Sequence, residues 1–283
     1  MSIINKVTIV GVGLIGGSIG LAVKKKKLAK EVVGVFRRRS SITKALRVRA
    51  VDRGTLDLAD GARGADLVII ATPVGMIPVM AKAAAKHLKR GAIITDVGSV
   101  KGPICRVIER AIGAGISFVG GHPMAGSEKS GPEFGEAGLF EGSVCILTRT
   151  SRTRAGALRV IARFWRSVGA DVSVMDPDLH DTIVAGVSHL PHIVAQTLCL
   201  SVGRESLKYA SGSFRDTTRV ASLNAGVWLD IFSANRKNVV KEIDRFSAVL
   251  KKIRRDLARG DYIRLKRTID AATLVREKYL KAE

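Results

Sequence analysis

A glycine-rich turn between an apolar run and a helical pattern constrains this chain more than any other feature. Residues 6–10 are Lys-Val-Thr-Ile-Val, which is typical of a strand buried on both faces. Residues 11–16 are Gly-Val-Gly-Leu-Ile-Gly, and a helix is expected from Leu14 to Lys27. The three glycines allow a tight turn, close approach of a pyrophosphate, and close packing of the helix on the strand. The segment therefore predicts a dinucleotide-binding site.

The end of the second predicted strand bears on which dinucleotide binds. In NAD-binding proteins of this type an acidic residue about 20 residues beyond the glycine motif holds the adenine ribose. Here the strand at 31–36 ends in Phe36. A basic and hydroxylated run follows it: Arg37, Arg38, Arg39, Ser40 and Ser41. Guanidinium and hydroxyl groups bind a 2′-phosphate, whereas a carboxylate repels it. We therefore favour NADP over NAD, and a solvated basic turn is the alternative explanation.

The net charge of the chain also needs an explanation. The 283 residues carry a formal charge of +22, which fits nucleic-acid binding because basic residues release counterions from phosphates. However, Lys and Arg are spread along the whole chain, aromatic residues make up only 5%, and no nucleic-acid-binding motif accompanies them. We expect a solvated basic surface that favours the approach of anionic cofactors and substrates, with no nucleic-acid partner.

The sequence predicts a cytoplasmic protein whose cysteines are reduced. No apolar run reaches the length of a membrane span, and the N-terminus enters a strand without a signal peptide, so a cytoplasmic protein is expected. Cys105, Cys145 and Cys199 are far apart and lack metal-ligand spacing. We interpret them as reduced core residues, and we expect neither a disulfide nor a metal site.

The order of predicted elements indicates two domains. Strands and helices alternate up to residue 174, which predicts a Rossmann-type, doubly wound, mostly parallel α/β sheet in a dinucleotide-binding domain at 1–174. Helices alone follow, at 178–209, 227–259 and 261–281, so 175–283 is expected to form an all-α domain that dimerises about a two-fold axis. The other elements expected before residue 175 are helices at 41–53 (capped by its serines), 76–89, 103 onward and 154–168, and strands at 66–71, 92–96, 117–119, 144–147 and 171–174.

A single histidine, His122, is the strongest candidate for a catalytic residue. It lies among glycines and a proline at 120–123, where we expect neither helix nor strand. The glycine turn, Thr72-Pro73, Ser99 and His122 all follow predicted strands, and the carboxyl ends of parallel strands share one crevice. Because imidazole accepts protons near neutral pH, the pattern predicts hydride transfer to a nicotinamide with His122 as the base. Ser99 is expected to orient the ring by a hydrogen bond, and a loop-capping serine is the alternative.

A second pair of histidines, His189 and His192, has the i, i+3 spacing that places both on one face of a helix. No third ligand has a suitable spacing, so a metal site is not expected. We interpret the pair as polar lining of a substrate cleft, and a satisfied pair in the helical core is the alternative.

Taken together, these motifs resemble the prephenate dehydrogenase family of tyrosine biosynthesis, which includes the arogenate dehydrogenases. The histidine-centred segments are more specific than the glycine loop, and the order and spacing of all segments agree with the family. The matching segments are 11–18, 71–73, 96–101, 121–128, 180–181, 188–192 and 214–221.

The resemblance implies oxidative decarboxylation of prephenate to 4-hydroxyphenylpyruvate with hydride transfer to NAD(P)+. It implies that His122 takes the proton of the ring hydroxyl and that Ser99 bonds to His122. It also implies that Arg219 holds a substrate carboxylate and that His189, His192 and Glu128 line the cleft. The helical domain would be the family's dimerisation domain, and no appended regulatory or mutase domain is expected. The positions expected to bind the cofactor are Gly11, Gly13, Leu14, Ile15, Gly16, Arg37, Arg38, Ser40, Thr72, Pro73 and Lys101.

Three alternatives remain at this point. Arogenate differs from prephenate in bearing an amino group in place of the keto group, and an acidic residue such as Asp216 or Glu128 would favour it. A 3-hydroxyacid dehydrogenase or imine reductase also joins the same two domain types but would not need His122. A basic nucleic-acid-binding protein on the same scaffold is the third.

Overall fold

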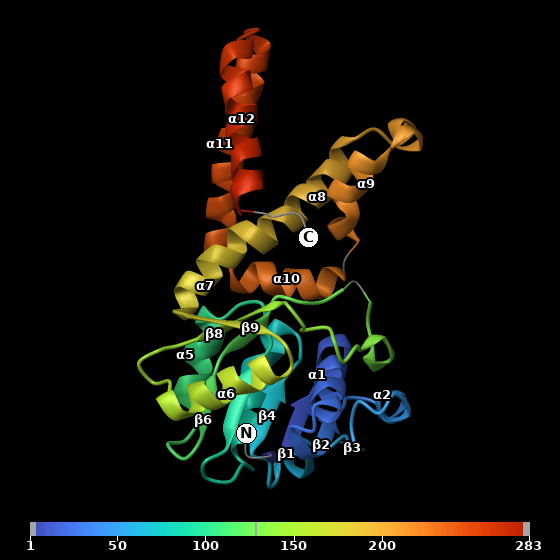
Figure 1. Cartoon of the computed structure of the whole chain (residues 1–283), viewed down its shortest axis with the longest axis vertical. Helices are drawn as coiled ribbons and strands as arrows, with labels where there is room; N and C mark the ends of the chain where they lie inside the picture. Colours follow the sequence, from blue (N-terminus) through green and yellow to red (C-terminus); the bar gives the residue numbers. More distant parts are fainter. Residues whose placement is uncertain (1–3, 128, 223, 280–283) are drawn as a thin grey trace. The chain divides into compact units, whose positions relative to one another are not determined.

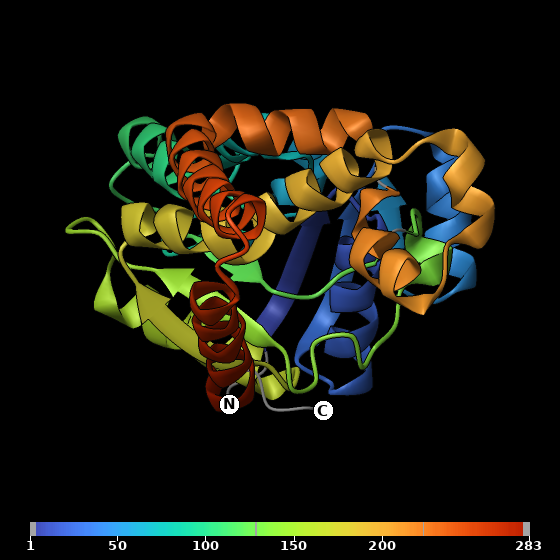
Figure 2. The ribbon, with the colours of Figure 1, turned by 90° about the horizontal axis from the view of Figure 1, so that it is seen from above.

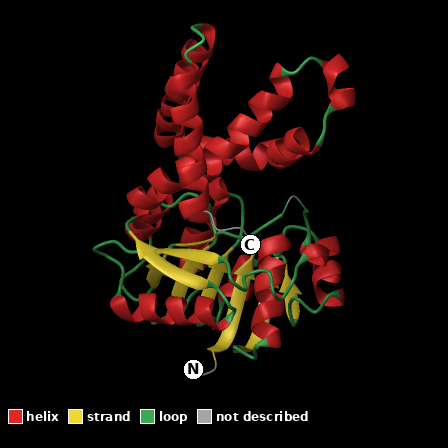
Figure 3. Cartoon of the chain, turned by 45° about the horizontal axis from the view of Figure 1, so that its top comes forward, coloured by secondary structure: helices red, strands yellow, loops and turns green. Residues whose placement is uncertain are grey.

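The computed structural model describes residues 4–127, 129–222 and 224–279 (Figure 1). The chain divides into two compact units, Met1–Asn235 and Arg236–Glu283. The first contains every strand of the described chain, and the second is formed by two helices. Figure 3 colours the helices red and the strands yellow. The domain boundary predicted after residue 174 falls inside the first unit and stays a prediction.

A six-stranded parallel sheet forms the centre of the first unit, in the order β3-β2-β1-β4-β5-β6. The order reverses direction between β1 and β4, which is the switch point where ligands bind in such sheets. The predicted doubly wound α/β fold is confirmed. The strands are β1 (Ile4–Val10), β2 (Ala29–Val35), β3 (Arg53–Thr55), β4 (Leu67–Ile70), β5 (Ile93–Asp96) and β6 (Ser117–Val119).

Helices cover both faces of this sheet because alternate strand residues are apolar on both sides. On one face Ile9 belongs to a core that includes Ile19 of α1 and Trp165 of α6. On the other face Ile70 belongs to a core with residues of α3, α4 and α5. Figure 2 shows α1 beside the neighbouring strands. The helices are α1 (Leu14–Lys25), α2 (Arg39–Arg47), α3 (Leu58–Ala62), α4 (Ile77–Ala85, after the 3₁₀ turn η1, Val74–Met76), α5 (Gly102–Ala111) and α6 (Ala155–Ser167).

A second, three-stranded sheet carries His122, and this corrects the prediction that no strand runs there. Strand β7 (Gly121–Pro123) pairs antiparallel with β8 (Val144–Thr148), which pairs parallel with β9 (Asp171–Met175). A Cβ at Gly121 would lie 2.8 Å from the Asp96 carbonyl oxygen, so glycine there serves close strand approach. The proline is tolerated because it ends a short edge strand. The strands at 144 and 171 therefore do not extend the six-stranded sheet.

Helix α2 also differs from expectation. It begins at Arg39 and ends at Arg47, instead of spanning 41–53, and its N-cap residue Arg38 makes no side-chain capping bond. The chain leaves the helix through Arg49, which has a positive φ of 58°, and then forms β3. The serines therefore lie inside the first turn and do not cap it.

The helical part of the first unit is more broken than predicted. The helix expected at 178–209 consists of α7 (Pro177–Val184), the π-helical turn η3 (Ala185–His189) and α8 (Leu190–Ser201), followed by the 3₁₀ turn η4 (Arg204–Tyr209). Then come α9 (Gly212–Thr218), the 3₁₀ turn η5 (Arg219–Ala221) and α10 (Ala225–Ala234). The helix expected at 227–259 is interrupted at Asn235. The second unit is formed by α11 (Arg236–Ala258) and α12 (Tyr262–Tyr279).

One helical stretch differs from the expectation that no apolar run could span a membrane. Residues Pro177–Ser201 are long and apolar enough by length and composition, with a mean hydropathy of 1.4. Two of its side chains, His180 and Asp181, hydrogen-bond to β7 and to the start of α5. These hydrogen bonds show that the stretch at 177–201 packs on the α/β layer at its N-terminal end.

Candidate active site

The glycine turn after β1 has the geometry of a phosphate cradle. Gly11 has a φ of +90°, and a Cβ there would lie 2.7 Å from the Ala71 carbonyl oxygen. A Cβ at Gly16 would lie 2.4 Å from the Gly11 carbonyl oxygen. At Gly13, by contrast, a Cβ would meet nothing within 4 Å. Gly11 and Gly16 thus allow close packing, whereas Gly13 leaves open space beside the start of α1.

The residues around this turn fit a dinucleotide. Helix α1 starts at Leu14 and Ile15 without a side-chain cap, so its first N–H groups are available to a phosphate. Thr72 lies beside Gly11, and its Oγ1 is buried with no hydrogen-bond partner among the described residues. A buried hydroxyl without a partner is rare unless a ligand or water satisfies it. Pro73 follows as an exposed residue in the N-cap position of the 3₁₀ turn η1.

The basic run after β2 is exposed, while the residue in the usual acidic position is not. The Phe36 side chain is buried and lies against Gly34 and Gly54. Arg37, Arg38 and Ser40 are exposed at the start of α2. A hollow of about 520 Å³ lies between this helix and β3 and is lined by Arg39, Ile42, Thr43, Gly54, Thr55, Leu56 and Asp57.

His122 is almost fully buried, with 8% of its surface exposed. Its Nδ1 lies 2.9 Å from Nε2 of His180, and the two rings meet edge to face. Burial lowers the pKa of His122 well below the usual value, and the nearby His180 and Lys101 lower it further. His122 is therefore a neutral imidazole at physiological pH. The sequence alone indicates no role for His180, although the His-Asp pair at 180–181 is one of the segments that resemble the family.

Asp181 connects this histidine pair to the helix framework. Its Oδ1 accepts hydrogen bonds from the Lys101 backbone N–H at 2.7 Å and from His180 Nδ1 at 2.8 Å. Its Oδ2 accepts the Gly102 backbone N–H at 2.8 Å. Asp181 thus caps the N-terminus of α5 while it holds His180.

Lys101 has surroundings that differ from the predicted cofactor contact. Its side chain is fully buried, its Nζ pairs with Asp96 Oδ2, and it donates to the Gly121 carbonyl oxygen at 2.8 Å. Asp96 in turn accepts the Gly121 N–H at 3.2 Å. The ammonium group therefore holds the backbone before His122, and the predicted contact of Lys101 with the cofactor stays a prediction.

The predicted hydrogen bond from Ser99 to His122 stays a prediction. Ser99 is half-buried in the loop after β5. The Nδ1 atom of His122 is already bonded to His180, so only its Nε2 atom is available to Ser99.

His189 lies in the π-helical turn η3 and is fully buried. Its Nδ1 is 3.2 Å from the amide nitrogen of Asn235, which also donates to the Asp181 carbonyl oxygen at 2.7 Å. Because an amide nitrogen donates, the ring proton of His189 must lie on Nε2. That atom is buried and has no partner among the described residues. Burial lowers the pKa of His189 to about 4.

His192 and Arg219 come together at the contact between α8 and η5. His192 Nδ1 donates to the Val220 carbonyl oxygen at 2.9 Å, and its ring lies 3.8 Å from that of Trp228, centroid to centroid. Burial lowers the pKa of His192, and the positive charge of the exposed Arg219 lowers it further. Glu128, the remaining predicted substrate contact, lies outside the described residues.

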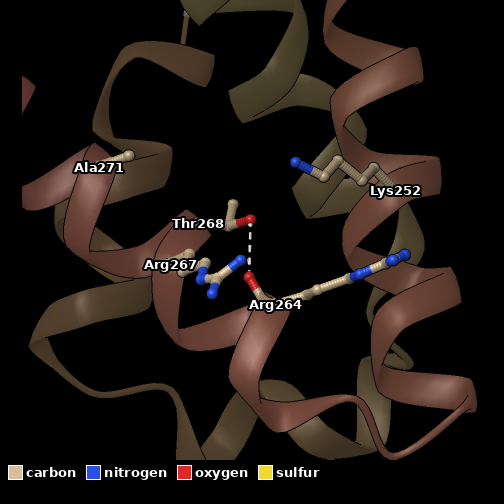
Figure 4. Close-up of a pocket in the computed structure, with 5 residues that line it drawn as sticks. All are labelled: Lys252, Arg264, Arg267, Thr268 and Ala271. Atoms are coloured by element: carbon tan, nitrogen blue, oxygen red, sulfur yellow. Dashed lines mark hydrogen bonds between the residues drawn. The ribbon is translucent and has the colours of Figure 1, made fainter.

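Another hollow, of about 440 Å³, lies in the α11–α12 unit (Figure 4). Its lining residues are Lys252, Arg264, Arg267, Thr268 and Ala271, with a Thr268 hydroxyl bond to the Arg264 carbonyl oxygen at 3.2 Å. This lining contains cations but no group that acts as a base near neutral pH. Within the described residues no three metal-ligating side chains gather at one place.

Comparison with known proteins agrees with this geometry. Residues 19–174 match the model of the prephenate dehydrogenase nucleotide-binding domain, and residues 176–271 match that of the prephenate dehydrogenase dimerization domain. A cyclohexadienyl dehydrogenase from Zymomonas mobilis is 36% identical, over 93% of this chain and 92% of its own length. A prephenate dehydrogenase from Bacillus subtilis is 35% identical, over 88% of this chain and 69% of its own length.

A solved structure is similar over nearly the whole chain. The crystal structure of prephenate dehydrogenase from Aquifex aeolicus, in complex with hydroxyphenyl propionate and NAD+, has a TM-score of 0.91 and 35% sequence identity. The similarity covers 98% of this chain and 99% of that one. From its two matching domain models and these relatives, the chain belongs to the prephenate dehydrogenase family.

Proposed function

We propose that the protein catalyses the oxidative decarboxylation of prephenate to 4-hydroxyphenylpyruvate in tyrosine biosynthesis. As a family member it is a dehydrogenase that uses a nicotinamide dinucleotide. The observation that carries the proposal is the buried, neutral His122, whose Nδ1 is engaged by His180 and whose Nε2 is left for a substrate. The Aquifex relative binds hydroxyphenyl propionate, which resembles the aromatic product of this reaction.

In this reaction the protein's main chemical task is to remove one proton. His122 Nε2 accepts the proton of the ring hydroxyl, and its neutral state at physiological pH keeps the lone pair available. The glycine turn at 11–16 with Thr72 and Pro73 would hold the dinucleotide, whose nicotinamide would supply the hydride acceptor for the carbon that bears this hydroxyl. The ring carboxylate leaves as CO₂, its bonding electrons complete the aromatic ring, and the ring oxygen regains the proton from His122 to give the phenol. Formation of the aromatic ring makes the step favourable.

The other candidate residues bind and orient the dicarboxylate substrate. The guanidinium of Arg219 suits a carboxylate because it donates two parallel hydrogen bonds. His189 offers a buried Nε2–H donor without a partner among the described residues, and His192 offers its Nε2 atom beside Trp228. We assign Arg219, His189, His192 and Glu128 to substrate binding. Ser99 would orient His122 through Nε2 in the free enzyme, and the substrate hydroxyl would replace Ser99 at that atom.

For the cofactor we propose NADP in preference to NAD. The glycine turn with Thr72 and Pro73 would hold the parts that both dinucleotides share. Phe36 stands where NAD-specific proteins carry an acid, and three arginines with Ser40 follow at the uncapped start of α2. Helix N-terminal N–H groups and guanidinium groups together favour a phosphate.

The protein is proposed to work as a cytoplasmic homodimer. Its second matching domain model is a dimerization domain, and α11 and α12 carry exposed apolar side chains that include Phe246, Leu250, Ile263 and Leu274. Dimer formation through these C-terminal helices would cover such side chains.

An absorbance assay at 340 nm tests the reaction. Purified protein is given prephenate or arogenate, each with NAD+ or NADP+. The proposal predicts the highest kcat/KM for prephenate with NADP+. A higher value for arogenate would replace the substrate assignment, a higher value for NAD+ would replace the cofactor assignment, and no reduction with any pair would refute the dehydrogenase reaction.

A further inference from the structure

We propose that His180, held by Asp181, is a positioning residue that keeps the proton of neutral His122 on Nδ1 and its lone pair on Nε2. The inference deepens the proposed function, because it explains how the base of that reaction is prepared. It rests on three consecutive side chains, Asp181, His180 and His122, joined by hydrogen bonds of 2.8 Å and 2.9 Å.

The direction of the first bond follows from Asp181. Its Oδ1 already accepts the Lys101 N–H, and its Oδ2 accepts the Gly102 N–H. A carboxylate in this position only accepts hydrogen bonds, so His180 Nδ1 must carry a proton and donate it. Burial lowers the pKa of His180, which is therefore neutral near pH 7 and carries no second proton. Its Nε2 consequently presents a lone pair.

The direction of the second bond follows from the first. Because His180 Nε2 is an acceptor, His122 Nδ1 must be the donor across the 2.9 Å contact. A neutral imidazole has one proton, so His122 Nε2 is left with its lone pair. The same neighbours stabilise the imidazolium that forms when His122 accepts a proton, since the Asp181 carboxylate lies behind the neutral ring of His180.

The arrangement does for this site what the aspartate does in serine proteases, where loss of the residue that fixes the histidine tautomer costs about 10⁴-fold in kcat. Here a second imidazole stands between carboxylate and base. The backbone supports the relay: Asp181 is fixed by the start of α5, and a Cβ on Gly102 would come within 3.0 Å of Asp181 Oδ2.

Two substitutions separate the role of the acceptor from the presence of the ring. His180→Gln keeps a side-chain oxygen that can accept the His122 Nδ1 proton, whereas His180→Leu removes the acceptor. His87→Leu, at an exposed histidine after α4, serves as the control. The chain has five histidines, so ¹⁵N-histidine labelling gives five ring systems that single substitutions assign. The ¹⁵N shifts report which nitrogen of each ring is protonated, in the free enzyme and without substrate.

The expected result has a spectroscopic and a kinetic part. His122 and His180 should both be protonated on Nδ1 in the unsubstituted protein. His122 should stay so in His180→Gln and in the control, and should lose this preference in His180→Leu. In the oxidation assay His180→Leu should lower kcat about 10²–10⁴-fold with the dinucleotide Kd unchanged. The kcat of His180→Gln should be at least about tenfold higher than that of His180→Leu.

Protonation of His122 on Nε2 in the unsubstituted protein would overturn the inference, as would an unchanged kcat in His180→Leu. If His180→Leu does not fold by circular dichroism, the tautomer in the unsubstituted protein and the His180→Gln kinetics decide the matter. The NMR measurement of the His122 tautomer uses no substrate, so it remains valid even if the protein does not oxidise prephenate. A wrong tautomer and a wrong reaction can therefore be distinguished.

Discussion

Lys101 and Asp96 form a fully buried ion pair that also holds the peptide before His122. The Lys101 ammonium donates to the Gly121 carbonyl oxygen, and Asp96 accepts the Gly121 and Gly98 N–H groups. The pair therefore ties β5, the start of α5 and β7 together at the carboxyl edge of the sheet. Catalysis and stability share this feature, because the strand that the pair fixes is the one that carries His122.

Removing one partner of this pair should be costly. Asp96→Asn or Lys101→Met leaves a buried charge without its partner, and each should lower the free energy of unfolding by about 3–5 kcal/mol. The double variant Asp96→Asn/Lys101→Met should lose less than the sum of the single losses, because it leaves no unpaired charge. Urea unfolding of all four proteins measures this, and additive losses would contradict the account.

The buried histidines should make the protein less stable in mild acid. Burial lowers the folded-state pKa of His122, His180 and His189, the last to about 4. An unfolded histidine titrates near 6.5, so below that pH the unfolded chain takes up protons that the folded protein does not. The stabilisation from these neutral rings is fully present above pH 6.5 and is lost as pH falls toward 4.

Urea unfolding between pH 7.5 and 5 checks this dependence. For His189 the shift corresponds to at most about 3 kcal/mol over its full range. The unfolding midpoint should fall steadily below pH 6.5, and His189→Gln should reduce the slope. A midpoint that is constant or rises between pH 6.5 and 5 would show that these rings are not kept neutral by burial.

The cofactor preference should depend on the basic turn after β2. Arg37→Ala removes a cation from the proposed 2′-phosphate site, so it should lower kcat/KM for NADP+ about tenfold more than for NAD+, the value of one charge-assisted hydrogen bond. Arg163→Ala, on the exposed side of α6, removes the same charge elsewhere and controls for the loss of net charge. Equal losses with the two cofactors in Arg37→Ala would remove Arg37 from the site.

Substrate binding should depend on Arg219. Loss of its carboxylate contact in Arg219→Ala should raise KM for prephenate about 10- to 100-fold, since hydrogen bonds to charged groups contribute about 1.5–3 kcal/mol. The dinucleotide Kd should not change. Arg204→Ala, an exposed arginine in η4, is the matched control. An unchanged KM in Arg219→Ala would discard the assignment.

The sequence predicts the parallel sheet and its glycine turn because both depend on local patterns. Buried strands such as 67–70 are continuous apolar runs, and the glycine spacing at 11–16 is typical of a dinucleotide-binding turn. The helices after residue 176 were also predicted, but their breaks were not. The π-helical turn at 185–189 and the interruption at Asn235 are fixed by tertiary contacts, including the Asn235 bonds to Asp181 and His189.

The sequence predicts those site residues that a local pattern marks, and it does not predict those that tertiary contacts bring together. His122 stands out because glycines and a proline surround it, and in the structure Gly121 allows close approach of strand β7 to Asp96. The role of His180 could not be deduced, since a helix-borne histidine 58 residues away meets His122 only in three dimensions. Lys101 belongs to the segment 96–101 that resembles the family, and its ion pair with Asp96 appears only in the folded structure.

The most direct test of the central claim is the turnover of His122→Asn with prephenate and the preferred dinucleotide. Asparagine is close in size to imidazole but cannot accept the proton, so kcat should fall about 10²–10⁴-fold. The dinucleotide Kd, followed by fluorescence titration, should stay the same because the glycine turn is untouched. A kcat within threefold of the unsubstituted enzyme would contradict the assignment of His122 as the base.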